Sequence, residues 1–319
     1  MNTSSHPLCI SPESPWLAPL AGYSDLAFRL LCRQHGCQIA VTEMVSAKGL
    51  IYGSPGTSDL LQTSPEEKVL VVQLFGAETS FLVQALERLK AMGYRYFDLN
   101  CGCSVRKVVK TGSGAALLKN PQVLIDIAKN ILPIAGPGCM GFKLRLGWNT
   151  GDNAYLALAQ NLEQLGAAWI TLHPRYATQG FSGQADWMHL AQLKQELRIP
   201  VIASGDLFSA EDALRCVQET GVDSVMFARG ALNDPHIFHR YQQLQKNTPS
   251  IKTQEEMCLA AQHLYALYCQ LNMQKVGLLK MRTLVPKFFK GLSNAKAVRR
   301  HIGSCSSWAE IQQVITSEA

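Results

Sequence analysis

Short runs of apolar residues alternate with longer amphipathic segments through the first three quarters of the chain. Eight of these runs have the length and the β-branched or aromatic content of strands, and they cover residues 16–20, 39–44, 69–75, 96–100, 140–146, 169–173, 200–204 and 224–228. The intervening segments carry apolar residues at helical spacing and predict helices over residues 25–35, 79–92, 121–132, 153–165, 186–197 and 210–220.

Most of the predicted strands are apolar at both alternating sets of positions, as strands covered by helices must be. Eight such units in succession indicate an α/β fold with a closed (β/α)8 TIM barrel, rather than an open doubly wound sheet. An open sheet would more often carry a glycine fingerprint after its first strand, and residues 18–22 (Ala-Pro-Leu-Ala-Gly) are not one. The connection after the second strand is less regular, and residues 64–67 in it read as a helix start or turn.

The last quarter of the chain predicts helices alone. Thr253 and Glu256 have the spacing of a capping box before an apolar-periodic stretch, and Ser307 and Glu310 repeat it before the last predicted helix. We therefore expect a catalytic barrel over residues 1–244 and a small C-terminal helical bundle over residues 245–319.

The composition is that of a folded globular protein. Of 319 residues, 47% are hydrophobic and 17% charged, which is enough apolar material for a large core. The ten cysteines include no Cys-x-x-Cys pair, so we expect reduced thiols and no metal site. With no signal-peptide pattern and no apolar run of membrane-spanning length, we expect a cytoplasmic protein, and we expect it to be a monomer.

Positive charge is concentrated at the C-terminal end. Residues 240–319 hold eleven Lys or Arg against four Glu, a net charge of +7, whereas the preceding 239 residues sum to −1. A solvated helical face and a surface that binds a polyanion both fit this excess.

A barrel of this kind gathers its functional residues just beyond the C-terminal ends of its strands. Unusual polar residues lie at these positions: Glu43, Gln73, Asn100, Cys103, Lys143, Arg145, His173, Arg175, Ser204, Asp206 and Arg229.

Cys103 follows the fourth predicted strand in the segment Asn-Cys-Gly-Cys (residues 100–103). The glycine permits a tight turn, and Lys107 and Lys110 make the surroundings electropositive, which is a setting for a functional thiol. A cysteine at a strand end also occurs simply as packing, and the segment alone leaves both interpretations open.

Lys143 and Arg145 alternate along the fifth strand, so they face the same side of it. A lysine inside a barrel is costly unless it meets an anion or a polarised ring, such as the edge of a flavin, although a cation at the rim is the simpler alternative. Gln73 offers donors and acceptors for the same ring edge, and His173 is either a site residue or a satisfied core histidine.

Glycine-containing loops follow the seventh and eighth strands. In such barrels these loops often hold a phosphate group, and Ser204-Gly205-Asp206 and Ala228-Arg229-Gly230-Ala231 have the glycines and the arginine that this requires.

Taken together, these segments resemble the tRNA-dihydrouridine synthases over nearly the whole chain. The matching stretches are residues 18–25, 42–44, 72–76, 98–103, 112–115, 143–147, 204–206 and 228–231, followed by residues 281–292 in the tail. The resemblance implies an enzyme that reduces uridine to 5,6-dihydrouridine in tRNA, with FMN as cofactor, NADPH or NADH as hydride donor, and a helical RNA-binding domain.

The resemblance also assigns roles to residues. Cys103 takes the place of the catalytic cysteine, Asn100 helps to seat the uracil, and reduced FMN would deliver hydride to C6 while Cys103 protonates C5. The residues expected to hold FMN are Pro19, Leu20, Ala21, Gln73, Lys143, His173, Ser204, Gly205, Asp206, Ala228, Arg229 and Gly230. Further substrate contacts are expected from Arg145, Arg175 and Lys107, and phosphate contacts from Lys287, Lys290, Arg299 and Arg300.

Three positions depart from the family pattern. Ser104 stands where proline is usual, Pro174-Arg175-Tyr176 replaces Gly-Arg-Thr, and Ser204 replaces asparagine. They leave open which uridine is modified. Two alternatives remain: a free-pyrimidine oxidoreductase resembling dihydroorotate dehydrogenases, which lack a basic helical tail, and a non-catalytic RNA-binding protein that retains flavin.

Overall fold

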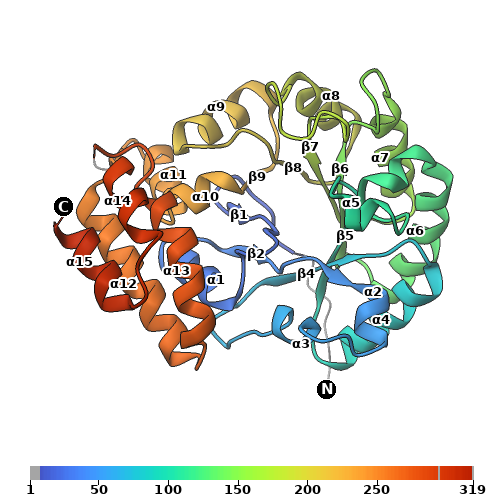
Figure 1. Cartoon of the computed structure of the whole chain (residues 1–319). Coiled ribbons are helices and arrows are strands. Elements are labelled where there is room, and N and C mark those ends of the chain that lie inside the picture. Colours follow the sequence, from blue (N-terminus) through green and yellow to red (C-terminus); the bar gives the residue numbers. More distant parts are fainter. Residues whose placement is uncertain (1–7, 294, 318–319) are drawn as a thin grey trace.

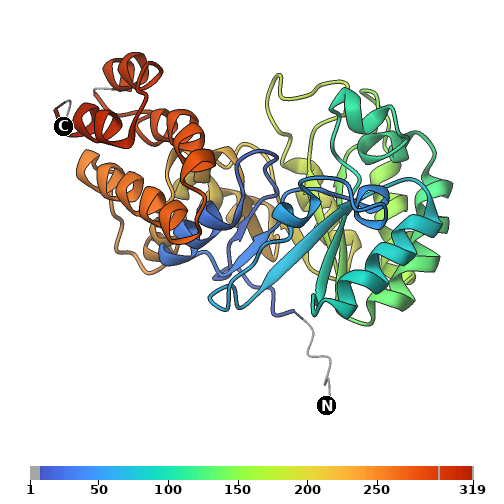
Figure 2. The same cartoon turned by 60° about the horizontal axis from the view of Figure 1, so that its bottom comes forward.

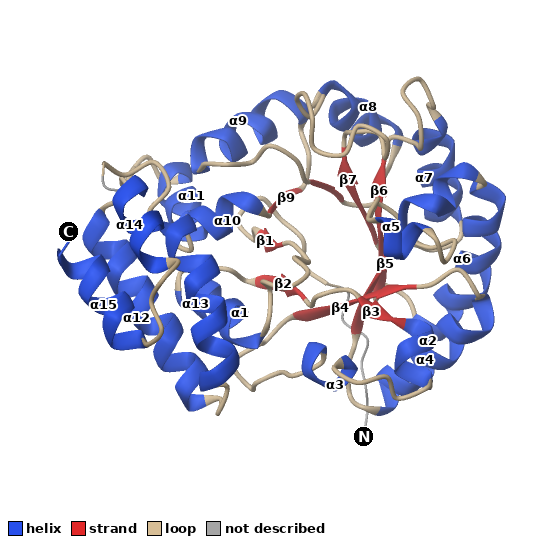
Figure 3. Ribbon diagram, in the orientation of Figure 1, coloured by secondary structure: helices blue, strands red, loops and turns tan. Residues whose placement is uncertain are grey.

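The computed structural model describes residues 8–293 and 295–317. The first seven residues, where we expect no signal peptide, lie outside the described residues. In the described chain, parallel strands form one ring with helices around it (Figure 3). The strands are β1 (Trp16–Leu17), β2 (Ile39–Val41), β3 (Val45–Ser46), β4 (Leu70–Phe75), β5 (Tyr96–Asn100), β6 (Met140–Arg145), β7 (Trp169–His173), β8 (Val201–Ala203) and β9 (Ser224–Phe227).

The ring is closed by the first strand. β1 pairs with both β2 and β9, and β2 pairs in turn with β4. β2 and β3 both pair with β4 and occupy one position in the ring, so the barrel has eight strand positions. The prediction of a (β/α)8 TIM barrel is confirmed.

The second predicted strand is interrupted. Val41 pairs with Val71 and Val45 pairs with Leu74, so one more residue separates the pairs on this strand than on β4, which is the mark of a β-bulge. Thr42 holds the bulge to β4, since its N–H donates to the Val71 carbonyl and its Oγ1 accepts from the N–H of Gln73. The prediction of one continuous strand over residues 39–44 was therefore wrong. The apolar pattern of a segment does not show which of its residues will lack a partner on the neighbouring strand.

The six predicted barrel helices are present. They are α1 (Leu26–Gln34), α4 (Thr79–Ala91), α6 (Pro121–Ala135), α7 (Ala154–Gln164), α8 (Met188–Glu196) and α9 (Ala210–Thr220). The structure adds the shorter helices α2 (Ala47–Ile51), α3 (Thr57–Leu60), α5 (Arg106–Val109), η1 (Gly114–Lys119) and α10 (Arg229–Asn233), and α11 (Ile237–Gln245). Residues 64–67 form a turn, in which the N–H of Glu67 donates to the carbonyl of Ser64.

The N-terminal end of the barrel is filled by side chains. Trp16 and Trp169 pack with ring centroids 5.5 Å apart, and Gly141 lies directly against the Trp169 indole. A Cβ atom on Gly141 would be only 2.1 Å from Trp169 Nε1, so no larger residue fits there. This packing leaves the C-terminal end of the barrel for a site.

Four helices follow the barrel and lie to one side of it in both views (Figures 1 and 2). They are α12 (Gln254–Gln270), α13 (Gln274–Phe288), α14 (Ala295–Ile302) and α15 (Trp308–Ser317). Thr253 and Glu256 form the predicted capping box at the start of α12. The predicted domain boundary, at residues 244 and 245, falls at the end of α11. Within the described chain, no helix combines the length and the apolar character needed to cross a membrane.

The C-terminal helices are fastened to the loop between β1 and α1. The Tyr268 hydroxyl donates to Asp25 Oδ2 over 3.0 Å, and Lys280 Nζ lies 3.1 Å from the same oxygen. Lys280 also donates to the carbonyl of Gly22. Because Pro19, Leu20 and Ala21 in this loop line the barrel cavity, the helical segment directly contacts one wall of the candidate site.

Candidate active site

A cavity opens at the C-terminal end of the strands and brings together most of the predicted site residues. Those that line it are Pro19, Leu20, Ala21, Asn100, Cys103, Lys143, Arg145, His173, Ser204, Gly205, Asp206, Ala228 and Arg229. Apolar side chains complete the wall, among them Met44, Phe181 and Phe208. A mostly apolar cleft with a few convergent polar groups is typical of a small-molecule or cofactor site.

Cys103 lies partly exposed in this cavity, on a loop held from two sides. Its N–H donates to Asn100 Oδ1 over 2.9 Å, and its carbonyl accepts from the N–H of Ala115 at 2.9 Å. Cys101, directly after β5, is buried, and burial raises the pKa of its thiol well above the ordinary value. Of the two thiols, Cys103 is therefore the one that can meet a bound molecule, even though Ser104 replaces the usual proline.

Asn100 holds this loop with its side-chain amide. Oδ1 also accepts from the N–H of Gly102 at 3.2 Å, and Nδ2 donates to Gln73 Oε1 at 2.8 Å and lies 3.0 Å from the Met44 sulfur. Asn100 lines the cavity, but these contacts engage both ends of its amide. The expected contact with uracil stays a prediction.

Gln73 lies behind the cavity wall. It is completely buried, and its Nε2 donates to Asp98 Oδ2 at 2.7 Å. Sequence reasoning did not single out Asp98, although an acidic residue inside a predicted buried strand was a visible signal. Burial raises the pKa of Asp98 to about 6, against the opposing effects of the Gln73 hydrogen bond and of Lys143.

Lys143 and Arg145 both point into the cavity from β6, as predicted. Burial lowers the pKa of Lys143 to about 8, an effect that nearby Asp98 opposes, and its Nζ donates to Ser204 Oγ at 3.3 Å. Arg145 instead clamps two loops, since its guanidinium donates to the carbonyls of Gly102, Tyr176 and Gly180 at 2.8 to 2.9 Å. Lys143 is thus the cation more available to a bound molecule.

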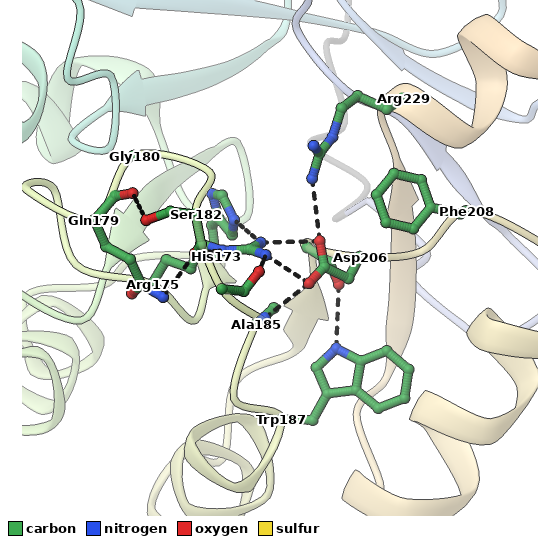
Figure 4. A network of polar contacts seen from close by, with 12 residues as sticks. His173, Arg175, Gln179, Gly180, Ser182, Ala185, Trp187, Asp206, Phe208 and Arg229 are labelled. Carbon is green, nitrogen blue, oxygen red and sulfur yellow. Dashed lines mark hydrogen bonds and ion pairs between the residues drawn. The ribbon is translucent and has the colours of Figure 1, made fainter.

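Asp206 is the centre of a polar network between the loops after β7 and β8 (Figure 4). It accepts two hydrogen bonds from Arg175, one from Arg229 at 3.1 Å and one from the N–H of Ala185 at 2.8 Å. Burial alone would raise the pKa of Asp206, but these contacts hold it below the ordinary value.

Arg175 does not lie at the barrel rim, where an RNA contact was expected. Its side chain is 1% exposed, and it is committed to Asp206 and to the carbonyls of Ser182 and Gly183. This placement favours a role in holding the site over direct contact with RNA. Lys107, by contrast, is exposed on α5.

His173 is neutral in these surroundings. Burial lowers its pKa to about 2, and the nearby cations Lys143, Arg145 and Arg175 act in the same direction. Its Nε2 lies 3.2 Å from Arg175 Nη1, and because arginine can only donate, Nε2 is the acceptor and the ring proton is on Nδ1.

The loops predicted to hold phosphate have backbone conformations suited to it. Gly205 has φ +128°, and a Cβ there would be 2.7 Å from the His173 ring; a Cβ on Gly230 would be 2.5 Å from the Leu207 carbonyl. Arg229 opens α10, where the first N–H groups of a helix have no partner within it, and its guanidinium lies 4.7 Å from the Phe208 ring centre. Glycines, a helix start and an arginine together are the features typical of an anion-binding corner, and we use that name for residues 204–206 and 228–230.

A basic groove continues from this corner to the C-terminal helices. Phe208 and Arg229 line it on the barrel side, and Arg282, Lys287, Lys290 and Arg299 line it on the other. Three of the four predicted phosphate contacts are therefore in the groove, while Arg300 does not line it. The residues that line the groove include no acidic side chain.

An apolar depression lies beside the cavity and shares Ala21 with it. Tyr23 from the β1–α1 loop and Val276 and Leu279 from α13 form its surface, and Leu279 is 66% exposed. Lys275 and Lys280 stand at its edge. A tyrosine ring beside exposed apolar side chains and lysines is a surface on which a base can stack.

The chain is similar throughout to one group of proteins. The profile of the family described as Dihydrouridine synthase (Dus) matches residues 16–319. The chain is 35% identical over 297 residues to "Probable tRNA-dihydrouridine synthase 1" of Synechocystis sp., which covers 92% of this chain and 82% of that protein. It is 32% identical over 255 residues to "tRNA-dihydrouridine synthase B" of Shewanella oneidensis, covering 79% of each.

Solved structures share the fold at low sequence identity. Histamine dehydrogenase from Rhizobium sp. 4-9 matches with a TM-score of 0.55 and 12% identity over 82% of this chain, which spans 50% of that longer chain. The old yellow enzyme homologue from Zymomonas mobilis matches with a TM-score of 0.53 and 11% identity, covering 78% and 94%. These matches concern the barrel architecture.

Proposed function

The chain belongs to the dihydrouridine synthase family, and on this basis we propose that it reduces a uridine of tRNA to 5,6-dihydrouridine. The observation that carries the proposal is that one cavity joins Cys103, Lys143 and an anion-binding corner, and opens towards a basic groove. A thiol, a cation and a phosphate site suit a flavin-dependent reduction, and the groove suits a nucleic acid.

The cavity residues fit FMN. Ser204 to Asp206 and Ala228 to Gly230 would hold its phosphate, because the backbone at Gly205 and Gly230 leaves no room for a side chain and Arg229 supplies positive charge. Pro19, Leu20, Ala21, Lys143 and His173 would hold the rest of the molecule, with Gln73 acting from behind through Asn100. Bound FMN, kept reduced by NADPH or NADH, would supply the hydride that adds to C6 of the uracil.

Cys103 supplies the other hydrogen. Addition of hydride at C6 requires a proton at C5, and the Sγ–H group of Cys103, on a loop held by Asn100, is the donor in the cavity. Arg145 keeps that loop closed through the Gly102 carbonyl, and Lys143 offsets negative charge that develops in the cavity. Asn100 and Arg145 thus act mainly by positioning Cys103.

The RNA would be held outside the barrel. A base inside a folded RNA must leave its stack to reach the bottom of such a cavity, so the protein must grip the flanking backbone. Lys287, Lys290 and Arg299 would contact phosphates, with Lys107 on the opposite side, and an unstacked neighbouring base would lie on Tyr23 and Leu279. With tRNA as substrate, we propose that the protein works in the cytoplasm, as a monomer.

The direct test uses the purified protein, an unmodified tRNA transcript and NADPH or NADH, with dihydrouridine measured by mass spectrometry. The expected result is a yellow protein that forms dihydrouridine in the transcript. A yellow protein that oxidises NADPH only with free uridine or orotate would replace the proposal with the free-pyrimidine alternative. A colourless protein that stays inactive with added FMN would refute the flavin assignment.

A further inference from the structure

Asp98 is a buried carboxylate that the proposed reaction does not use. It lies on β5 with 3% of its surface exposed, opposite Gln73 of β4 and Gly141 of β6 in the strand register. Asn100 is two residues further along the same strand, so both side chains face the barrel interior. Burying a carboxylate inside a barrel costs free energy unless it is hydrogen-bonded or paired with a charge.

We propose that Asp98 is a positioning residue for Cys103, acting through the side-chain amides of Gln73 and Asn100. The catalytic consequence of this inference rests on the proposed function. The positioning itself rests on a series of hydrogen bonds that links four groups: the Asp98 carboxylate, the Gln73 amide, the Asn100 amide and the N–H of Cys103.

Each link fixes the direction of the next. An ionised carboxylate only accepts, so Gln73 must turn its Nε2 to Asp98, 2.7 Å away, and its Oε1 towards Asn100. Asn100 must then donate Nδ2 to that oxygen at 2.8 Å, which leaves Oδ1 for the N–H of Cys103 at 2.9 Å. If either amide turned over, like groups would face each other in a buried place.

The other surroundings of Asp98 explain why a carboxylate is needed and an amide would not serve. Lys143 is close enough to favour the ionised form of Asp98. The second carboxylate oxygen, Oδ1, is buried without a hydrogen-bond partner among the described residues. An asparagine here would either turn its NH2 group to the Gln73 Nε2, so that two donors meet, or bury that NH2 group at the Oδ1 position without an acceptor. That conflict would pass along the amides to the Cys103 loop.

The test compares Asp98→Asn with Thr171→Val. Thr171 is also completely buried, on β7, and its hydroxyl has no hydrogen-bond partner among the described residues, so its removal controls for a change inside the barrel. Asp98→Asn should lower kcat for dihydrouridine formation about tenfold, roughly the effect of one buried hydrogen bond, with the KM for tRNA unchanged. Thr171→Val should retain both values. Equal kcat in the two variants would overturn the proposal.

A second measurement does not depend on activity. FMN-free protein is treated with iodoacetamide, and the labelling of Cys103 and Cys101 is followed separately by mass spectrometry. Asp98→Asn should label Cys103 several times faster than wild type because its loop is less firmly held, while buried Cys101 stays unlabelled. Unchanged labelling of Cys103, or equal labelling of Cys101, would overturn the proposal. A wild type without uridine reduction would instead refute the proposed function and leave this result intact.

The route through Gln73 is tested by combination. Residues linked in one series of hydrogen bonds give non-additive mutational effects. Asp98→Asn should therefore change the labelling rate of Cys103 little in a protein where Gln73→Leu has already broken that series. Fully additive effects would show that Asp98 acts by another route. If Asp98→Asn does not fold, Gln73→Leu alone, with Asp98 intact, should accelerate the labelling of Cys103. An unchanged labelling rate would refute the proposed hydrogen-bond series.

Discussion

Arg175, which is buried, and Asp206, which is partly exposed, form a bidentate ion pair that joins the loops after β7 and β8. Nη2 and Nη1 of Arg175 lie 2.6 and 2.9 Å from the two carboxylate oxygens, and the arginine side chain is 1% exposed. Asp206 has φ +55°, a left-handed conformation uncommon outside glycine, and the ion pair helps to hold the anion-binding corner in that shape.

Arg175→Lys should lower the free energy of unfolding of the FMN-free protein by about 2 kcal/mol, because lysine keeps the charge but loses the parallel hydrogen bonds. Urea unfolding measures this, and FMN titration should show weaker binding. Arg215→Lys is the control, since Arg215 is 59% exposed in its ion pair with Asp212. Equal stabilities for the two variants would mean that the Arg175–Asp206 pair does not hold the corner.

Cys103→Ala should retain FMN and bind tRNA like wild type, yet lose at least about a hundredfold in dihydrouridine formation, the usual contribution of a positioned proton donor. Cys101→Ala removes a neighbouring buried thiol and is the matched control. The measurement is the yield of dihydrouridine after a single turnover, compared between the two variants. Unimpaired turnover by Cys103→Ala would contradict the assignment of the proton donor.

The stability of the protein should fall as pH drops below about 6.5, partly through His173. Its pKa is lowered to about 2 in the folded protein, so the unfolded chain binds the extra proton first and folding loses up to about 1.4 kcal/mol per pH unit. His173→Asn in the FMN-free protein should therefore show a shallower loss between pH 6.5 and 4. Equal slopes for His173→Asn and wild type would be inconsistent with a buried neutral His173.

Lys290→Ala should weaken tRNA binding and reduce the salt dependence of the affinity by about one unit, as expected when one phosphate contact is lost. Lys290 lines the basic groove, whereas Lys129 lies on α6, outside the groove, so Lys129→Ala is the control. Fluorescence anisotropy across a salt series gives both quantities. An equal salt dependence of the affinity for Lys290→Ala and wild type would show that Lys290 does not contact an RNA phosphate.

Leu279→Ser should weaken tRNA binding by about fivefold, the scale expected when a partly buried apolar contact is lost, without changing the salt slope. The unchanged slope separates an apolar contact from a phosphate contact. Leu259→Ser is the control, because Leu259 is 48% exposed on α12, away from the depression. If both serine variants bind alike, the depression does not take a base.

The sequence by itself determined the order of strands and helices and the place of Cys103. Apolar periodicity reports burial, and eight buried runs separated by helices allow few arrangements other than a closed parallel barrel. Since parallel strands deliver their ends to one side, the lysine, the histidine and the glycine loops could be assigned to one site before their distances were known.

Only the tertiary structure decided what these side chains contact. Arg175 turns inward to Asp206, Gln73 turns to Asp98, and one extra residue between Val41 and Val45 interrupts the second strand. Each depends on strand register and on partners far away in the chain, and the free energy of a buried polar group is set by the neighbour it meets rather than by its own residue type. Asp98 was not singled out from the sequence, because only its hydrogen bond to Gln73 connects it with the Cys103 loop.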